Sequence, residues 1–175
     1  VSLTLNTSSA VKLALNLRYP VWATHVEVKI NGKSVKVKQT PSSYIVLDRT
    51  WHNGDFLEIN YSMSLQAVET NDNPDKFAVM YGPIVLAGVM GTQGMAASAP
   101  FSNPALHNDY YTYDYRVPEN LTTALQLDKG KLDSYIKPSV EDKLVFHVLK
   151  EGVRLEPIYR IHRQRYVVYW DLIHE

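Results

Sequence analysis

The most informative absence in this 175-residue sequence is cysteine, of which there is none. Disulfides, zinc sites built from thiolates and a cysteine nucleophile are therefore excluded within the chain. No run of apolar residues is long enough to span a membrane, and the first residues lack the pattern of a secretory signal. The sequence opens in strand-like alternation, "VSLTLN", without a starter methionine. We therefore expect residue 1 to be a processing site or an internal boundary of a longer protein.

A block of like charge is also missing. Eighteen basic and eighteen acidic residues give a formal net charge of zero and are interspersed along the chain. Binding to nucleic acid needs a clustered positive face, and so does binding to an anionic membrane. We therefore expect neither as a partner. Hydrophobic residues make up 45% of the chain, which is enough for a core in one domain or two small ones.

Amphipathic helices are absent too, because no stretch of about ten or more residues carries an apolar stripe at helical spacing. The dominant period is two instead. It runs through "VKLALNLR" (11–18) and "HVEVKI" (25–30), and Asn31-Gly32 then predicts a tight hairpin turn. The pattern predicts an all-β fold, an antiparallel and jelly-roll-like sandwich, with two packed sub-sandwiches as the alternative.

Three regions are expected along the chain. Residues 1–90 should form the core strands, residues 91–140 a loop-rich segment with a tyrosine-rich strand, and residues 141–175 the terminal strands that complete the sandwich. The apolar stretch "FAVMYGPIVLAGV" (77–89) predicts one central strand that is bent at Gly82-Pro83.

Catalytic and metal-binding patterns are weak. Six histidines are scattered without the spacing of a metal site, so we expect no metal and no cofactor in this chain. "ETNDNPDK" (69–76) is interpreted as a polar turn rather than a calcium loop. A small hydrolase would need two carboxylates facing one cleft, and this alternative stays open although no spacing selects a pair. The carboxylates that could serve are Asp48, Asp55, Glu58, Glu156 and Asp171.

The best binding feature by chemistry alone is "DYYTYDY" (109–115). In an extended strand Tyr111, Tyr113 and Tyr115 line one face, and such a row of aromatic rings can stack on sugar rings. Packing of the same rings over a sandwich edge or against a partner domain is the competing interpretation. The three tyrosines are therefore candidates for carbohydrate binding.

Four segments together carry a resemblance to a known family. They are "RYPVWA" (18–23), "YIVLDRTWHNGDFLEI" (44–59), "FAVMYGPIVLAG" (77–88) and "PIYRIHRQRYVVYW" (157–170). In this order they resemble the C-terminal part of the bacterial glycoside hydrolases typified by β-L-arabinofuranosidases, glycoside hydrolase family 127. One departure is Arg163, which stands where the family often has an aspartate, and this affects the local pattern of ion pairs.

The resemblance implies that an α/α barrel carries the catalytic carboxylate, the cysteine nucleophile and the zinc-bound cysteines, and that β-sandwich domains follow it. This chain would then be a non-catalytic sandwich that supports the barrel of an exo-acting hydrolase on arabinofuranose-containing plant glycans. A carbohydrate-binding module that uses an aromatic face is the alternative function. The implied partners are the barrel, a glycan and a second copy of the chain. The implied location of the parent is periplasmic or secreted, with a cytoplasmic location as the alternative.

Eleven residues of the matching segments are expected to hold the sandwich or the domain contact: Arg18, Trp22, Arg49, Trp51, Asp55, Gly82, Pro83, His162, Arg165, Tyr166 and Trp170. The last segment is predicted to be one strand with alternating faces. Tyr166, Val168 and Trp170 would then lie on one face, and Arg165 with its alternate neighbours on the other.

Overall fold

The computed structural model of the chain describes residues 1–93 and 121–174. The chain divides into two compact units, Val1–Ser64 and Leu65–Glu175. In both units the described residues form mainly antiparallel β-strands. The predicted all-β, sandwich-like fold class is therefore confirmed.

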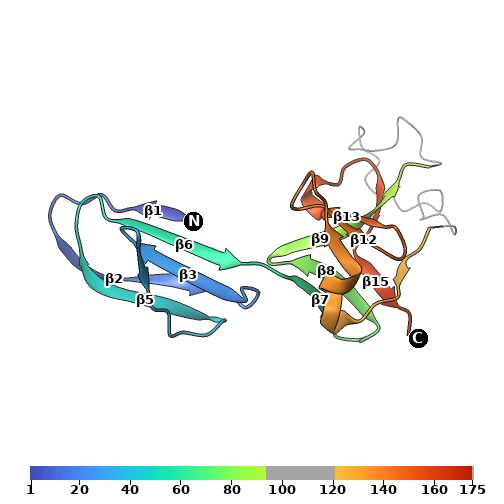
Figure 1. Ribbon diagram of the computed structural model, residues 1–175, viewed down its shortest axis with the longest axis horizontal. Helices are drawn as coiled ribbons and strands as arrows, with labels where there is room; N and C mark the ends of the chain where they lie inside the picture. The colour runs from blue at the N-terminus through green and yellow to red at the C-terminus, as the bar shows by residue number, and fades with distance from the viewer. Residues whose placement is uncertain (94–120, 175) are drawn as a thin grey trace, which may run out of the picture. The chain divides into compact units, whose positions relative to one another are not determined.

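The first unit consists of two sheets (Figure 1). Its larger sheet has four strands in the order β1 (Ser2–Thr4), β6 (Phe56–Ser62), β3 (His25–Ile30) and β4 (Lys33–Val35). Its smaller sheet pairs β2 (Val11–Tyr19) with β5 (Ser43–Trp51).

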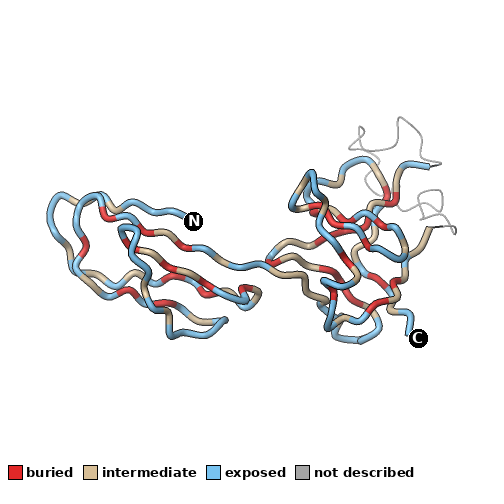
Figure 2. Tube along the Cα trace, in the orientation of Figure 1, coloured by how far each residue is buried: buried red, intermediate tan, exposed pale blue. Residues whose placement is uncertain are grey.

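Alternating side chains explain how the first unit is built. Along β2 and β5 every second residue is exposed, and the residues between them are buried or half-buried (Figure 2). The inward residues of both sheets gather into one hydrophobic cluster. The turn between β3 and β4 has positive φ at both Asn31 (51°) and Gly32 (76°), as a two-residue type I′ hairpin requires. The sequence-based prediction of this hairpin is confirmed.

The second unit is one larger sheet with short strands. Its main path runs β10 (Ala124–Leu125), β15 (Tyr169–Leu172), β8 (Lys76–Tyr81), β9 (Ile84–Gly91), β13 (Arg154–Pro157), β12 (Phe146–Val148) and β11 (Ile136–Pro138). Two strands pair off this path, β7 (Leu65–Glu69) with β8 and β14 (Arg165–Val167) with β9. The helical pieces are η4 (Lys129–Lys131), α1 (Leu132–Tyr135) and η5 (Ile158–Arg160). Within the described residues, no helix is long and apolar enough to cross a membrane.

The prediction of one bent central strand over 77–89 is wrong. The segment forms two strands, β8 and β9, which pair with each other so that Tyr81 faces Ile84 across a two-residue turn. Gly82 has a φ of 55°, and glycine at the first central position is typical of a type II′ hairpin turn. Gly82-Pro83 therefore reverses the chain instead of bending it.

The terminal segment also differs from its prediction. β14 pairs with β9, where Val167 faces Gly88, whereas β15 pairs with β8, where Tyr169 faces Ala78. The chain thus changes partner strand at Val168, and this resets the alternation of faces. Tyr166 is consequently exposed and Trp170 fully buried, so the expectation that they share a face is wrong.

Trp170 belongs to the buried core of the second unit. Phe77 and Leu86 from the β8–β9 hairpin and Leu155 from β13 belong to the same buried cluster. The indole of Trp170 occupies the place where a Cβ on Gly88 would lie. The second unit begins at Leu65, whereas the boundary predicted from sequence lies at residue 90.

Candidate functional site

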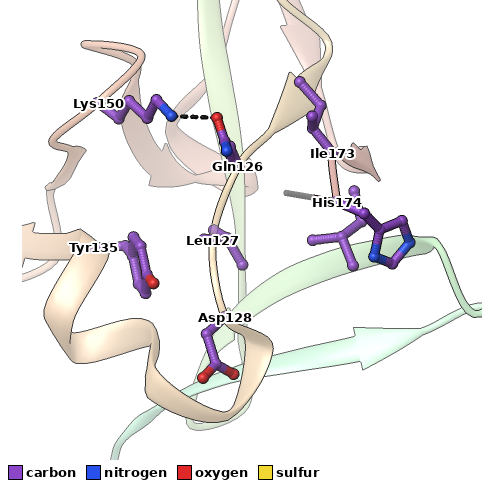
Figure 3. Close-up of a pocket in the computed structure, with 8 residues that line it drawn as sticks. Gln126, Leu127, Asp128, Tyr135, Lys150, Ile173 and His174 are labelled. Atoms are coloured by element: carbon purple, nitrogen blue, oxygen red, sulfur yellow. Dashed lines mark hydrogen bonds between the residues drawn. The ribbon is translucent and has the colours of Figure 1, made fainter.

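A pocket of about 310 Å³ opens in the second unit (Figure 3). Its lining comes from the segment after β10, the end of α1, the turn after β12 and the end of β15. The residues that line it are Gln126, Leu127, Asp128, Tyr135, Lys150, Leu172, Ile173 and His174. Apolar and polar side chains from four separate elements thus meet around one cavity.

One wall of the pocket is the segment that follows β10. The amide of Ile173 donates to the carbonyl of Leu125 (2.9 Å), which extends the parallel pairing of β10 with β15. The amide of Gln126 donates to Oε1 of Glu151 (2.8 Å), so a partly buried contact fixes the backbone there. The side chain of Gln126 accepts a hydrogen bond from Nζ of Lys150 at one end of the pocket (Figure 3).

Asp128 lies at the other end of the pocket and caps η4. Its Oδ1 accepts from the amide of Gly130 (2.8 Å), and its Oδ2 lies 3.2 Å from Nζ of Lys131. The hydrogen bond from the Gly130 amide, followed by that from Lys131, lowers the pKa of Asp128 below its ordinary value. Asp128 therefore presents a carboxylate, which accepts hydrogen bonds only.

Tyr135 and His174 form two further sides of the pocket. Tyr135 ends α1, and its carbonyl accepts from the amide of Leu149 (2.9 Å), which places Lys150 next to it. In Figure 3 the Tyr135 ring lies across the pocket from Ile173 and His174.

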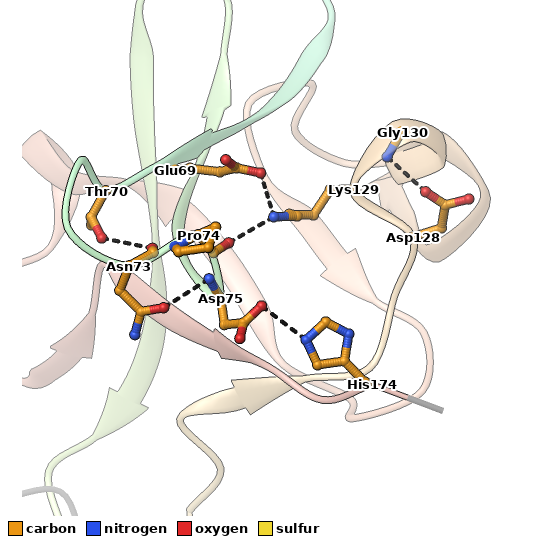
Figure 4. Close-up of polar contacts among 9 residues, drawn as sticks. All are labelled: Glu69, Thr70, Asn73, Pro74, Asp75, Asp128, Lys129, Gly130 and His174. Atoms are coloured by element: carbon orange, nitrogen blue, oxygen red, sulfur yellow. Dashed lines mark hydrogen bonds and ion pairs between the residues drawn. The ribbon is translucent and has the colours of Figure 1, made fainter.

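His174 contacts a polar network that includes Asp75 (Figure 4). Nε2 of His174 lies 2.8 Å from Oδ1 of Asp75, and the carbonyl of Asp75 accepts from the amide of Leu172 (2.7 Å). Asp75 itself sits in a turn where its amide donates to Oδ1 of Asn73 (2.9 Å). Residues 70–75, between β7 and β8, therefore form a polar turn that anchors the end of β15, in agreement with the interpretation of 69–76 from sequence.

Lys129 ties the same turn to η4. Its Nζ donates to Glu69 and to the carbonyl of Pro74 (2.7 Å), two contacts that bridge more than fifty residues of sequence (Figure 4). Across residues 1–93 and 121–174, no group of three or more His, Cys, Asp or Glu side chains is placed to hold a metal ion.

Sequence reasoning did not single out this pocket. Its residues are spread from Gln126 to His174 without a shared motif, and the strand pairing that brings them together is long-range. The one local signal is "DKGK" (128–131). An aspartate two residues before a glycine is typical of a turn in which the carboxylate accepts a backbone hydrogen bond.

The residues predicted from the family segments lie elsewhere. In the first unit Trp51 is fully buried, and its Nε1 donates to the carbonyl of Leu13 (3.1 Å). The guanidinium of Arg49 lies 5.0 Å from the centre of the Trp51 ring, and its Nη2 lies 3.9 Å from Oδ2 of Asp55. Arg49, Trp51 and Asp55 thus form one group.

Asp55 is buried and joins two turns. Its Oδ1 accepts from Nδ2 of Asn31 (2.8 Å) and its Oδ2 from the amide of His52 (2.9 Å). The Oδ1 of Asn31 in turn accepts from the amide of Phe56 (2.8 Å). The hydrogen bond from Asn31, then that from the His52 amide, lowers the pKa of Asp55 despite its burial.

Arg18 and Trp22 meet a third residue, Tyr61. The Tyr61 hydroxyl donates to the carbonyl of Arg18 (2.7 Å), and the Trp22 ring packs edge-on at 5.7 Å between centroids. The guanidinium of Arg18 lies 5.2 Å from the centre of the exposed Tyr44 ring. Arg18 and Trp22 therefore both contact Tyr61 within the first unit.

In the second unit the predicted residues are dispersed. Gly82 and Pro83 form the hairpin turn, whereas Arg165 is buried and its Nη1 donates to the carbonyl of Gln93. His162 is exposed after η5. Tyr111, Tyr113 and Tyr115 lie outside the described residues.

The architecture defines a class of protein with two successive β-units, and comparison with known families agrees with this division. Residues 66–172 match a domain of unknown function, DUF4986, and the chain belongs to that family because the match spans more than half of it. Residues 1–63 match the middle domain of GH127 β-L-arabinofuranosidases. The resemblance to this hydrolase family, proposed from sequence motifs, is therefore confirmed.

Solved structures show the same fold. A GH127 β-L-arabinofuranosidase from Geobacillus stearothermophilus matches 98% of the chain with a TM-score of 0.62 at 20% identity. A second structure, described as a glycoside hydrolase, matches 99% with a TM-score of 0.59 at 18% identity. A GH127 β-arabinofuranosidase matches 98% with a TM-score of 0.54 at 17% identity. The chain spans only 28–30% of the length of these proteins, and no curated protein matches it.

Proposed function

We propose that the chain is the non-catalytic β-sandwich region of a bacterial glycoside hydrolase that acts on arabinofuranose-containing glycans, where it supports the catalytic barrel of the same polypeptide. The observation that carries the proposal is the pair of family matches. The match to the GH127 middle domain covers 1–63 and the second begins at 66, so each match follows one compact unit. Related hydrolases hold both units within a chain more than three times as long.

The carboxylates that could have served as a catalytic pair support the same proposal, because most have structural partners. Asp55 holds two turns together. Glu156 lies 2.7 Å from Nε of Arg154, and Asp171 forms an ion pair with Lys76. A general acid with a raised pKa is a requirement of glycoside hydrolysis. Asp55 has the opposite property, because its hydrogen bonds from Asn31 and the His52 amide lower its pKa.

One outer surface of the second unit supports a role in domain contact. Val68 and Tyr169 both face Ala78 of β8 from opposite sides, so the three residues form a row on one face of the sheet. Val68 is 44% exposed and Tyr169 57%. Large amphipathic rings on an exposed apolar face are enriched where proteins meet one another. We name this row the Tyr169 face and propose that the barrel of the same polypeptide covers it.

The parent protein provides the test of the main proposal. An immunoblot of source cells with an antibody to this chain should show a band of about 66–71 kDa, which is 19.9 kDa divided by the fractions 0.30 and 0.28. The purified parent should hydrolyse a chromogenic arabinofuranoside, and the 175-residue chain should not exceed a buffer blank. Turnover by the chain alone would refute the non-catalytic role and favour the carboxylate-pair alternative.

A charge substitution tests the contact with the barrel. Tyr169→Glu in the full-length parent should lower the thermal midpoint of the barrel, because it places a charge in an apolar contact, while the isolated chain keeps its own midpoint. Val140→Glu serves as the control, since Val140 is fully exposed in the loop between β11 and β12. Equal midpoints for the two parent variants would contradict the proposed contact.

A further inference from the structure

The pocket around Asp128 and Lys150 has no part in the proposed support of the barrel, yet it has the features of a ligand site. We propose that it binds one neutral sugar unit, which would give the second unit a glycan site of its own. The inference rests on the proposed function only for the choice of sugar, an arabinose residue. The pocket itself is defined by this chain's described residues.

The size of the pocket favours a small ligand. Ligand sites usually have volumes of about 300–1,000 Å³. At about 310 Å³ this pocket lies at the lower end of that range. A single sugar ring with its hydroxyl groups therefore suits it better than an extended oligosaccharide or a nucleotide.

The charges at the two ends of the pocket favour a neutral ligand. The ammonium group of Lys150 lies at one end and the carboxylate of Asp128 at the other (Figure 3). Asp128 already pairs with Lys131, and Lys150 donates to the side chain of Gln126, so a charged ligand would have to compete with these contacts. A hydroxyl group both donates and accepts, so a sugar can donate to the carboxylate at one end of the pocket or accept from the ammonium group at the other.

Apolar side chains complete the match to a sugar. Leu127 is buried at the back of the pocket, while Leu172 and Ile173 line it from the end of β15. The ring of Tyr135 lies on the opposite side. The C–H face of a sugar ring is apolar and packs on aromatic and aliphatic side chains, whereas its hydroxyl groups reach the polar ends.

The pocket is also largely preformed. The amide of Gln126 is fixed by Glu151, the amide of Ile173 by Leu125, and the ring of His174 by Asp75. The first two bonds hold the backbone of two walls between segments that are far apart in sequence, whereas the His174–Asp75 pair is exposed. Preorganisation lowers the cost of binding, which matters for a ligand as small as one sugar.

Nuclear magnetic resonance can test the site on the 175-residue chain. Three probes are titrated separately into the labelled protein: L-arabinose, arabinotriose and inorganic phosphate. We expect saturable shifts with the two sugars at the amides of Gln126, Lys150 and Ile173, and none with phosphate. Sugar titrations that leave these amides unmoved, or saturation by phosphate instead, would overturn the inference.

A matched pair of variants sharpens the test. Lys150→Met keeps the length of the side chain and removes its charged donor, so the dissociation constant should rise about tenfold, the effect expected for one charged hydrogen bond. Lys143→Met, an exposed lysine at the other end of β12, should bind like the wild type. The spectra also report whether each variant folds, and equal affinities for folded Lys150→Met and wild type would refute the assignment.

The two proposals can fail separately. If the parent hydrolyses arabinofuranosides but no sugar shifts the amide resonances of Gln126, Lys150 and Ile173, the binding site is refuted and the proposed function stands. A parent without that activity, together with saturable binding of arabinose at these amides, would overturn the proposed function and leave the binding site standing.

Discussion

The two units reach a β-fold by different means. In the first unit, nine consecutive pairs join β2 to β5 without a break, from Val11 opposite Trp51 to Tyr19 opposite Ser43. In the second unit, β8 and β9 pair over only three positions before their other ends take new partners. The first unit is thus specified by regular alternation, and the second by how distant segments fit together.

Polar contacts repeat this difference. The first unit uses Asn31 and Asp55 to join two neighbouring turns, separated by 24 residues. The second unit uses Lys129 to reach Glu69 and His174 to reach Asp75, across 60 and 99 residues. Long-range contacts give the second unit its pocket, because that pocket exists only where those segments meet. The function proposed for the pocket therefore depends on the less regular unit.

The largest effects are expected from the two buried tryptophans. Trp51→Ala should destabilise the first unit and Trp170→Ala the second, each by about 3–5 kcal/mol, since both rings are fully buried. Hydrogen exchange measured by mass spectrometry should lose protection only in the unit that carries the substitution. Loss of protection in both units with either variant would show that the two cores do not fold separately.

Phenylalanine variants of the same residues refine this prediction. Nε1 of Trp51 bonds to the carbonyl of Leu13, whereas Nε1 of Trp170 is buried without a partner among the described residues. Trp51→Phe should therefore cost about 1 kcal/mol more than Trp170→Phe, because only the first loses a hydrogen bond. Denaturant titration of both variants measures the difference, and a larger cost for Trp170→Phe would contradict it.

A single methyl group should produce the next largest effect. Gly88→Ala places a Cβ where the Trp170 indole lies, and overpacking of this kind costs about 1–3 kcal/mol. The cost should nearly vanish in a Trp170→Leu background, which removes the ring that causes the clash. A double-mutant cycle by denaturant titration checks this, and an undiminished cost would place the strain elsewhere.

The sequence predicts the first unit well for a physical reason. Apolar and polar residues alternate in 11–18 and 25–30, and buried and exposed side chains alternate there in the same order. Asn31-Gly32 defines a turn that tolerates few other conformations. Those signals are local, so one sequence contains them. The family motifs around Trp51 and Asp55 likewise lie close together in sequence and in space.

The second unit shows where such signals stop. At 77–89 the apolar run is equally compatible with one long strand or with a hairpin, and only the pairing of Tyr81 with Ile84 distinguishes them. At Val168 the change of partner strand leaves no mark in the residue pattern. The pocket around Asp128 and Lys150 likewise depends on a long-range pairing, that of β10 with β15, which is why no motif predicted it.

Acid should weaken each unit through the carboxylates whose pKa is lowered, which include Asp55 in the first unit and Asp142 in the second. The lowered pKa of Asp55 means that its bonds stabilise the first unit above the ordinary pKa of 3.8, and that this contribution is lost as the pH falls below 3.8 through the lowered pKa. In the second unit the hydrogen bonds from the Leu144 amide and from Arg160 lower the pKa of Asp142. Its contribution to stability is lost over the same range of pH. Asp55→Asn should flatten the pH dependence of the first unit only, and Asp142→Asn that of the second only.

Hydrogen exchange followed from pH 7 down to pH 2 separates the two responses, because each variant reports on its own unit. If Asp55→Asn leaves the acid response of the first unit unchanged, another group controls it. If it changes both units, the division of the chain into two separately stable parts is contradicted.

The smallest effects should come from surface ion pairs, where the two units should behave alike. Glu27 lies 3.1 Å from Lys29 two residues away, whereas Asp171 pairs with Lys76 across 95 residues. All four side chains are at least one-third exposed, and exposed pairs contribute about 0.2–1 kcal/mol whatever their separation in sequence. Lys29→Met and Lys76→Met should therefore cost similar amounts in denaturant titrations, and both costs should fall in about 1 M salt, where the screening length is about 3 Å. A cost for Lys76→Met well above 1 kcal/mol would mean that the second unit depends on its long-range polar contacts as strongly as on the packing of Trp170 against Gly88.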